Sequence, residues 1–149
     1  MTKPRAEHDL EKAVPFLLAR AGARMGNAFA RALKQYGLSL TEWRVCASLA
    51  HTPDQTLSEL SMHAAADLSA LSRIVDRLVA RRLANRRRAQ DDKRAVLISL
   101  TPRGTTLTHE IVPLARHYES VALADFKASE IRALREMLER LYQNATPLL

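Results

Sequence analysis

The segment from Asp67 to Gly104 concentrates the basic side chains of this chain. It holds ten Lys or Arg residues and four Asp or Glu residues, a balance of +6, while the whole chain of 149 residues carries +7. Arginine presents a rigid fork of donors that fits phosphate oxygens and the edge of guanine. Net charge alone fits an ordinary solvated surface equally well. Its concentration in one short segment favours a nucleic acid as the partner.

The first half of this segment has the apolar spacing of a helix with one buried face. The apolar residues recur at intervals of three and four: Leu68, Leu71, Ile74, Val75, Leu78 and Val79. The opposite face is small, hydroxylated and basic, and comprises Ser69, Ser72, Arg73, Asp76, Arg77 and Ala80. Small side chains let a helix enter the major groove of DNA deeply. We therefore expect this helix to read DNA.

The polar residues of this face have distinct expected roles. Arg73 is expected to contact base edges, the alternative being a solvated charge paired with a neighbour such as Asp76. Arg77 is expected to hold a phosphate. Asp76 is expected to orient an arginine or to disfavour wrong DNA sites. Ser69 and Ser72 are expected to contact bases or phosphates, and a purely structural role is equally open for them.

The second half of the segment has the pattern of a β-hairpin. Arg86, Arg87 and Arg88 precede the polar residues 90–94, and an alternating run rich in apolar and β-branched residues follows over 95–101. A hairpin directly after a DNA-reading helix is a wing. Lys93 and the three arginines are expected to contact phosphates, although strand alternation must point some of the arginines away.

The order and spacing of these motifs resemble the MarR family of bacterial winged helix-turn-helix regulators. The matching residues are 71–78, 91–95 and 100–104, with a further match at 40–45. The resemblance implies a mainly α fold, in which a winged helix-turn-helix DNA-binding lobe carries a two-stranded β wing. It also implies that the N- and C-terminal helices form a dimerisation platform.

The resemblance further implies particular site residues. Arg94 at the tip of the hairpin is similar to the family's minor-groove arginine, with Asp92 holding it through a charge-assisted hydrogen bond. Trp43 occupies a position that lies near the effector cavity in the family. The family usually has glycine where this chain has Arg82, so a left-handed helix end is costlier here and leaves the entry angle of the wing open.

The function implied by the resemblance is that of a homodimeric repressor on double-stranded DNA. Two-fold symmetry requires a near-palindromic operator with half-sites about one helical turn apart. A small effector, often aromatic or anionic, would relieve repression. Arg20 and Arg24, on a flank of the first helix, could meet a ligand carboxylate, the alternative being solvated or dimer-bridging charges.

The remaining patterns predict one domain over residues 1–149, with dimerisation helices within 7–36 and 102–149 and the winged lobe over 40–101. Pro15 is expected to kink or delay the first helix, Gly37 to end it, and Pro113 to interrupt and bend the helix after the wing. The residues expected to cap helix starts are Thr41, Thr56, Asp67, Thr101 and Ser129.

Composition narrows the class of protein. The chain is 47% hydrophobic but only 5% aromatic, so it can fold around a mostly aliphatic core. It has no apolar run of the length that a membrane span needs. Residues 1–10 carry charges of both signs and no signal-type apolar stretch, so a cytoplasmic location without membrane contact is expected.

Three alternatives to the regulator remain. The first is a sequence-tolerant architectural DNA-binding protein without an effector. The second is a redox sensor acting through Cys46, the single cysteine, although core packing is the simpler role for it. The third, a small enzyme, is disfavoured because no catalytic or phosphate-binding motif is present. Neither a cofactor nor a metal site is expected, since the five histidines are scattered.

Overall fold

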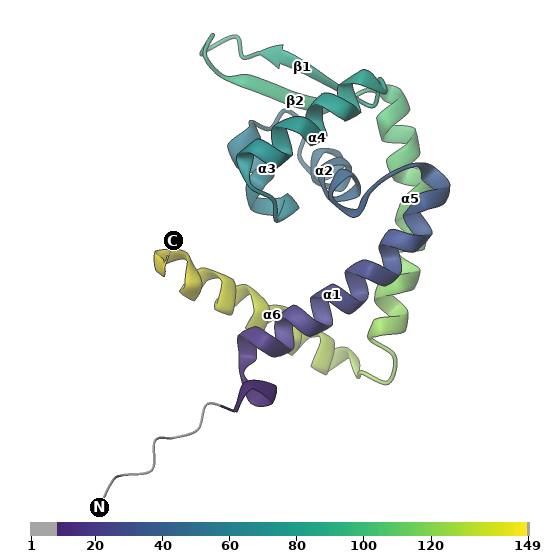
Figure 1. The fold of residues 1–149 in the computed structure, drawn as a ribbon, viewed down its shortest axis with the longest axis vertical. Helices are drawn as coiled ribbons and strands as arrows, with labels where there is room; N and C mark the ends of the chain where they lie inside the picture. Colours follow the sequence, from purple (N-terminus) through teal and green to yellow (C-terminus); the bar gives the residue numbers. More distant parts are fainter. Residues whose placement is uncertain (1–8, 149) are drawn as a thin grey trace, which may run out of the picture. The chain divides into compact units, whose positions relative to one another are not determined.

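The computed structural model describes residues 9–148 and contains mostly helices (Figure 1). The elements are α1 (Val14–Leu33), α2 (Leu40–His51), α3 (Leu57–Ala64), α4 (Leu68–Ala80), β1 (Ala84–Arg88), β2 (Val96–Leu100), α5 (Pro102–Ala122) and α6 (Ala128–Ala145). The mainly α fold with a two-stranded wing is therefore confirmed. The chain divides into two compact units, one ending at Ala115 and the other starting at Arg116.

Several helix boundaries follow from local chemistry as predicted. Thr56 and Glu59 form the capping box of α3, and Asp67 caps α4 by accepting from the Ala70 N–H. Thr101 Oγ1 accepts from the Gly104 N–H at the start of α5. Pro15 delays α1, which begins at Val14, whereas the expected first residues Glu7 and His8 lie outside the described residues.

Two predicted caps and one predicted break are wrong. Ser39, not Thr41, caps α2, because Ser39 and Glu42 exchange reciprocal hydrogen bonds of 3.1 and 2.8 Å. Ser129 lies inside α6, which begins earlier because the Glu130 carboxylate accepts from the Lys127 N–H. Pro113 does not interrupt α5, which continues through it to Ala122 even though a proline inside a helix lacks the N–H for one backbone hydrogen bond.

The wing is an antiparallel hairpin that lies alongside α4 (Figure 1). Ala84 pairs with Leu100 and Arg88 with Val96, so Arg86 stands opposite the buried Ile98. The other edge of β2 is also occupied. Gln55, in the loop between α2 and α3, forms two backbone hydrogen bonds with Ile98, of 3.1 and 2.8 Å. Gln55 therefore forms an isolated β-bridge with the side of the hairpin's second strand that faces away from β1, and links the wing to the loop between α2 and α3.

The core of the first unit is aliphatic, as composition predicts. It draws on α1 to α5 and on both strands, and its fully buried side chains include Leu33, Val45, Leu49, Leu60, Leu71, Val75, Leu78, Leu83, Ile98 and Ile111. Gly104 allows α5 to begin directly against this core. A Cβ there would lie 2.0 Å from the Leu83 carbonyl oxygen, so any larger residue would displace the chain. The start of α5 can therefore lie this close to Leu83 only because residue 104 is a glycine.

The second unit contains the end of α5 and α6. An ion pair between Arg135 and Glu119, 3.0 Å long, joins these two segments. Large apolar side chains remain exposed on α6, among them Met137, Leu138, Leu141 and Tyr142. Within residues 9–148, no helix is long and apolar enough to cross a membrane.

Candidate nucleic-acid interface

The α4 helix separates an apolar face from a polar one as its periodicity predicts. Leu71, Ile74, Val75 and Leu78 are buried, whereas Ser69, Arg73, Asp76 and Arg77 are exposed and Ser72 is half-buried. Leu68 differs from the prediction, since half of its surface is exposed. It is the first residue of the helix, and the buried stripe begins one turn later. The polar face is therefore free to meet a partner along its length.

The start of α4 is stabilised by Asp67 and Ser69. The Asp67 carboxylate accepts from the Ala70 N–H at 2.8 Å and from the Ser69 hydroxyl at 2.9 Å. These two hydrogen bonds, the first foremost, lower the pKa of Asp67. Ser69 thus has a structural partner, although its oxygen stays exposed at the helix start. Arg73, one turn further on, makes no ion pair with any residue of 9–148.

Arg77 is held by a buried carboxylate. Its Nε lies 3.1 Å from Oε1 of Glu42, a residue of α2 that is only 6% exposed. Arg81, at the end of α4, approaches the other oxygen of Glu42 at 3.9 Å and donates to the Gly37 carbonyl at 2.7 Å. Two turns of α4 are therefore anchored to α2 by one carboxylate. Part of the Arg77 guanidinium stays accessible, since 56% of the side chain is exposed.

Asp76 joins α4 to the wing. Its carboxylate forms an ion pair with Arg86 of β1, and Arg86 also donates to the Ser72 carbonyl at 3.4 Å. The alternative in which Asp76 pairs with Arg73 does not occur in this structure. Asp76 therefore orients an arginine, one of its two expected roles. The arginine that it orients belongs to the hairpin, so α4 and the wing are joined by this ion pair.

The other wing arginines differ in their surroundings. Arg87 pairs with Asp54 of the loop before α3 at 2.9 Å, and Arg88 donates to the Lys93 carbonyl at 3.3 Å. Asp92 accepts from the backbone N–H of Arg94 at 3.0 Å. The expected hydrogen bond from the Arg94 guanidinium to the Asp92 carboxylate is not present. The carboxylate instead accepts from the Arg94 backbone N–H and so stabilises the turn at the tip of the hairpin. Lys93 and Arg94 are exposed at the tip and lack an ion pair within residues 9–148.

The junction between α4 and the wing has the strained conformation expected for Arg82. Arg82 has a φ of 59°, in the left-handed region where glycine is favoured. The Leu83 N–H donates to the Leu78 carbonyl at 2.9 Å, and Thr101 Oγ1 donates to the Arg82 carbonyl at 2.7 Å. These bonds hold the turn without glycine, so the chain leaves α4 along a path fixed by its neighbours.

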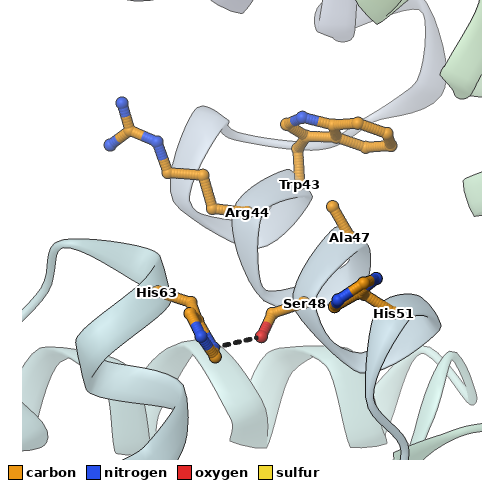
Figure 2. A pocket seen from close by; sticks show the side chains of 6 residues that line it. All are labelled: Trp43, Arg44, Ala47, Ser48, His51 and His63. Atoms are coloured by element: carbon orange, nitrogen blue, oxygen red, sulfur yellow. Dashed lines mark hydrogen bonds between the residues drawn. The ribbon is translucent and has the colours of Figure 1, made fainter. Parts of the chain in front are cut away.

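A cavity of about 270 Å³ opens between α2 and α3 (Figure 2). It is lined by Trp43, Arg44, Ala47, Ser48, His51 and His63. Trp43, for which a position near an effector cavity was predicted, lines this cavity, and its role in ligand binding stays a prediction. The centroids of the Trp43 and Phe29 rings lie 5.7 Å apart in an edge-to-face arrangement. Arg20 and Arg24 are not in the lining, and Arg20 lies over the ring of Phe16 on its own helix.

Sequence reasoning missed five of the six lining residues. Trp43, Ala47 and His51 are four residues apart, so they share one side of α2, with Arg44 and Ser48 beside them. That spacing was visible in the sequence. The contribution of His63 was not, because it depends on how α3 packs against α2. Together the lining offers several hydrogen-bond donors, one guanidinium and no carboxylate.

Cys46 is not placed for redox chemistry. It is 1% exposed, and its burial, followed by the neighbouring Glu42 carboxylate, raises the pKa of the thiol to about 11. The reactive thiolate is therefore scarce at neutral pH. Across residues 9–148, no three His, Cys, Asp or Glu side chains are grouped so that they could hold a metal ion.

Comparison with known proteins shows that this chain is similar to bacterial transcriptional regulators. The model of the MarR family matches residues 38–96. The Pseudomonas putida HTH-type transcriptional repressor IacR is 26% identical over 146 residues, which are 97% of this chain and 87% of IacR. A probable transcriptional regulator from Pseudomonas aeruginosa is 31% identical with a TM-score of 0.76, covering 89% of this chain and 98% of that one.

A further solved relative carries information about an effector. Bordetella bronchiseptica BpsR, whose DNA binding is regulated by 6-hydroxynicotinic acid, is 26% identical with a TM-score of 0.77. The match covers 87% of this chain and 98% of BpsR.

Proposed function

This chain belongs to the MarR family of transcriptional regulators, and on that premise we propose that it is a homodimeric repressor of a near-palindromic operator. In this proposal α4 enters the major groove, where Arg73 contacts base edges and Ser69 and Ser72 contact bases or phosphates. The tip of the wing, with Lys93 and Arg94, contacts the flanking minor groove and its phosphates. Binding to chromosomal DNA implies a cytoplasmic location.

One observation carries the DNA-binding proposal. Arg73 and Arg94, which have no ion pair within residues 9–148, lie on two elements that the Asp76–Arg86 ion pair joins. Two positive charges held at a fixed separation can contact a major groove and the adjacent minor groove of DNA without a further loss of conformational entropy. Arg77, Arg86 and Arg87 already have carboxylate partners. We assign these three mainly to holding α4 and the wing in place, with phosphate contact as a secondary role for their free N–H groups.

Exposed apolar side chains support the homodimer. On α1 and just before it, Leu10, Val14, Leu17, Leu18 and Met25 are exposed, and α6 carries a similar exposed stripe. Rows of exposed apolar side chains of this kind are typical of interfaces with another protein chain. We assign residues 7–36 and 102–149 to the dimer and residues 40–101 to the DNA-binding lobe. The mass of the purified protein, measured by light scattering over a range of concentrations, tests the dimer directly.

The cavity beside Trp43 is the proposed effector site. A small aromatic anion suits it, because Arg44, His51 and His63 surround an apolar floor and no carboxylate is present. BpsR supports the same class of ligand. Binding would favour a spacing of the two reading helices that does not fit the operator. Trp43 is the single tryptophan, so its fluorescence during titration with 6-hydroxynicotinate reports occupancy. A constant signal with unchanged operator affinity would count against this effector.

Selection of genomic fragments by the purified protein tests the central proposal. At physiological salt, sequencing of the bound fragments is expected to reveal one imperfect palindrome, with half-sites about one helical turn apart. Bound fragments without any shared motif would overturn sequence-specific repression. They would favour the architectural alternative, in which affinity depends steeply on salt and hardly on sequence.

A further inference from the structure

We propose that Ser48 and Gln55 are positioning residues that couple the cavity between α2 and α3 to the wing. This inference rests on the proposed function, in which the wing contacts DNA. Gln55 occupies the edge of β2 that faces away from β1, and the Ser48 hydroxyl links Gln55 to the cavity.

Gln55 holds one edge of β2 in position. The strand pairs with β1 along one edge. Along the other edge, the backbone of Gln55 both donates to and accepts from Ile98, and it is the one backbone partner there among residues 9–148. Ile98 is 2% exposed and Gln55 is 3% exposed, so this junction is inside the protein. A shift of Gln55 would therefore be passed to β2 through two short, buried hydrogen bonds.

The side chain of Gln55 is held almost wholly by Ser48 and Thr52. Its amide nitrogen donates to the Thr52 carbonyl at 2.6 Å and to the Ser48 carbonyl at 2.9 Å, and it lies 3.1 Å from Ser48 Oγ. Its amide oxygen lies 3.3 Å from the same hydroxyl. A buried amide must keep its hydrogen bonds, because leaving one unmade is costly. The orientation of Gln55 therefore follows that of Ser48.

Ser48 is also part of the cavity wall. Its hydroxyl lies 2.9 Å from Nδ1 of His63, across the cavity from α2 to α3 (Figure 2). A hydroxyl has a single proton to donate. The Gln55 amide oxygen accepts this proton, His63 Nδ1 competes for it in the tautomer that leaves Nδ1 unprotonated, and an acceptor oxygen of a ligand in the cavity would join that competition. Occupation of the cavity thus changes the hydrogen bonding of Gln55 and, through Ile98, the position of β2.

Amide hydrogen exchange at Ile98 tests the link between Ser48 and β2 without any ligand. Ser48→Ala removes the hydroxyl but leaves Gln55 its two carbonyl partners, so the fold is expected to persist. We expect exchange at Ile98 to be about five- to tenfold faster, the effect of losing one hydrogen bond. Ser48→Thr, which restores a hydroxyl, is expected to rescue it. Gln55→Met provides a second test from the other side of the bond and is expected to act like Ser48→Ala.

A matched control separates this link from general loosening. Ser61→Ala removes a hydroxyl of α3 that donates to the Ser58 carbonyl at 2.7 Å and does not contact Gln55. It is expected to leave Ile98 exchange unchanged. Equal acceleration by Ser48→Ala and Ser61→Ala, or no acceleration by Ser48→Ala and Gln55→Met, would overturn the proposal.

A double-mutant cycle then tests the coupling to DNA. No hydrogen bond joins Arg94 to Ser48 within residues 9–148. The fold-losses in operator affinity caused by the two substitutions should therefore multiply unless both residues act through the wing. We expect Ser48→Ala to weaken binding about fivefold alone and hardly at all in the Arg94→Ala background. Multiplicative losses would overturn the coupling to DNA. If the wild-type protein selects no DNA sequence, the proposed function fails, whereas Ile98 exchange still decides whether Ser48 positions β2.

Discussion

Nε of Arg77 lies 3.1 Å from Oε1 of Glu42, which joins the exposed face of α4 to a carboxylate buried in α2. The same carboxylate caps α2 through the Ser39 N–H and also attracts Arg81. The Glu42 side chain thus caps the start of α2 and also holds α4 in position against α2. This explains how an α4 surface rich in arginine keeps a fixed orientation before any DNA is bound.

Glu42→Gln is expected to lower the free energy of unfolding by about 1–2 kcal/mol, because the amide keeps the cap but loses the charge that holds Arg77. Solvent around the half-exposed arginine limits the loss. Urea denaturation measures it. Glu59→Gln is the matched control, since Glu59 holds the same capping position in α3 and forms no ion pair within residues 9–148. Equal losses in the two variants would contradict a role for the Arg77 pair.

Arg73→Ala is expected to relax sequence preference, because a base-reading arginine supplies about 1–3 kcal/mol of discrimination at one position. Competition between the selected operator and single-base variants measures this effect. Arg73→Lys keeps the charge but loses the fork, so it should retain non-specific affinity and still lose discrimination. Unchanged preferences in both variants would show that Arg73 is only a solvated charge.

Arg94→Ala is expected to weaken binding to all sequences by a similar factor, because in the proposed complex Arg94 would meet the minor groove and its phosphates. The slope of log affinity against log salt concentration should fall by about one. Affinity measured at several salt concentrations gives both values. A variant that keeps its affinity and salt slope but prefers different bases would instead assign Arg94 to base reading.

Gly104→Ala is expected to destabilise the protein by about 1–3 kcal/mol or more, because the added methyl group would overlap the Leu83 carbonyl. Thermal unfolding measures the change. Gly22→Ala in α1 is the control, since among residues 9–148 of one protomer no atom outside its chain neighbours and its own helix backbone lies within 4 Å of the added methyl. Gly22 lies in the segment proposed for the dimer, so the comparison is made at a protein concentration at which light scattering gives both variants the same mass. That variant should be stabilised by about 0.5–1 kcal/mol through helix propensity. Similar behaviour of the two variants would disprove the close approach of α5 to the wing.

The raised pKa of Cys46 predicts a loss of stability in alkali. The folded protein keeps the thiol proton up to about pH 11, whereas the unfolded chain begins to lose it near pH 9. Stability should therefore fall between these values, by at most about 3 kcal/mol. Cys46→Ala should remove this part of the decline in urea titrations at several pH values. Fast labelling of the native thiol at neutral pH would instead restore the redox alternative.

Much of the winged lobe could be predicted because its signals are local. The apolar period of α4, the capping box at Thr56 and Glu59 and the alternation of β2 each depend on residues a few positions apart. The missed cap at Ser39 belongs to the same class, since its partner Glu42 is three residues away. The left-handed turn at Arg82 was also expected from sequence, through the glycine that the family usually has there.

By itself, the sequence determined which side chains stand on the exposed face of α4 and that a basic hairpin follows it. Only the tertiary structure decided which arginines are free. Arg77 pairs with Glu42, Arg86 with Asp76 and Arg87 with Asp54, over separations of 10 to 35 residues, whereas Arg73 and Arg94 have no such partner within residues 9–148. The cavity has the same origin, because His63 meets Ser48 only after α3 packs on α2. Local periodicity fixes the direction of a side chain, but an ion pair or a cavity depends on distances that only packing sets.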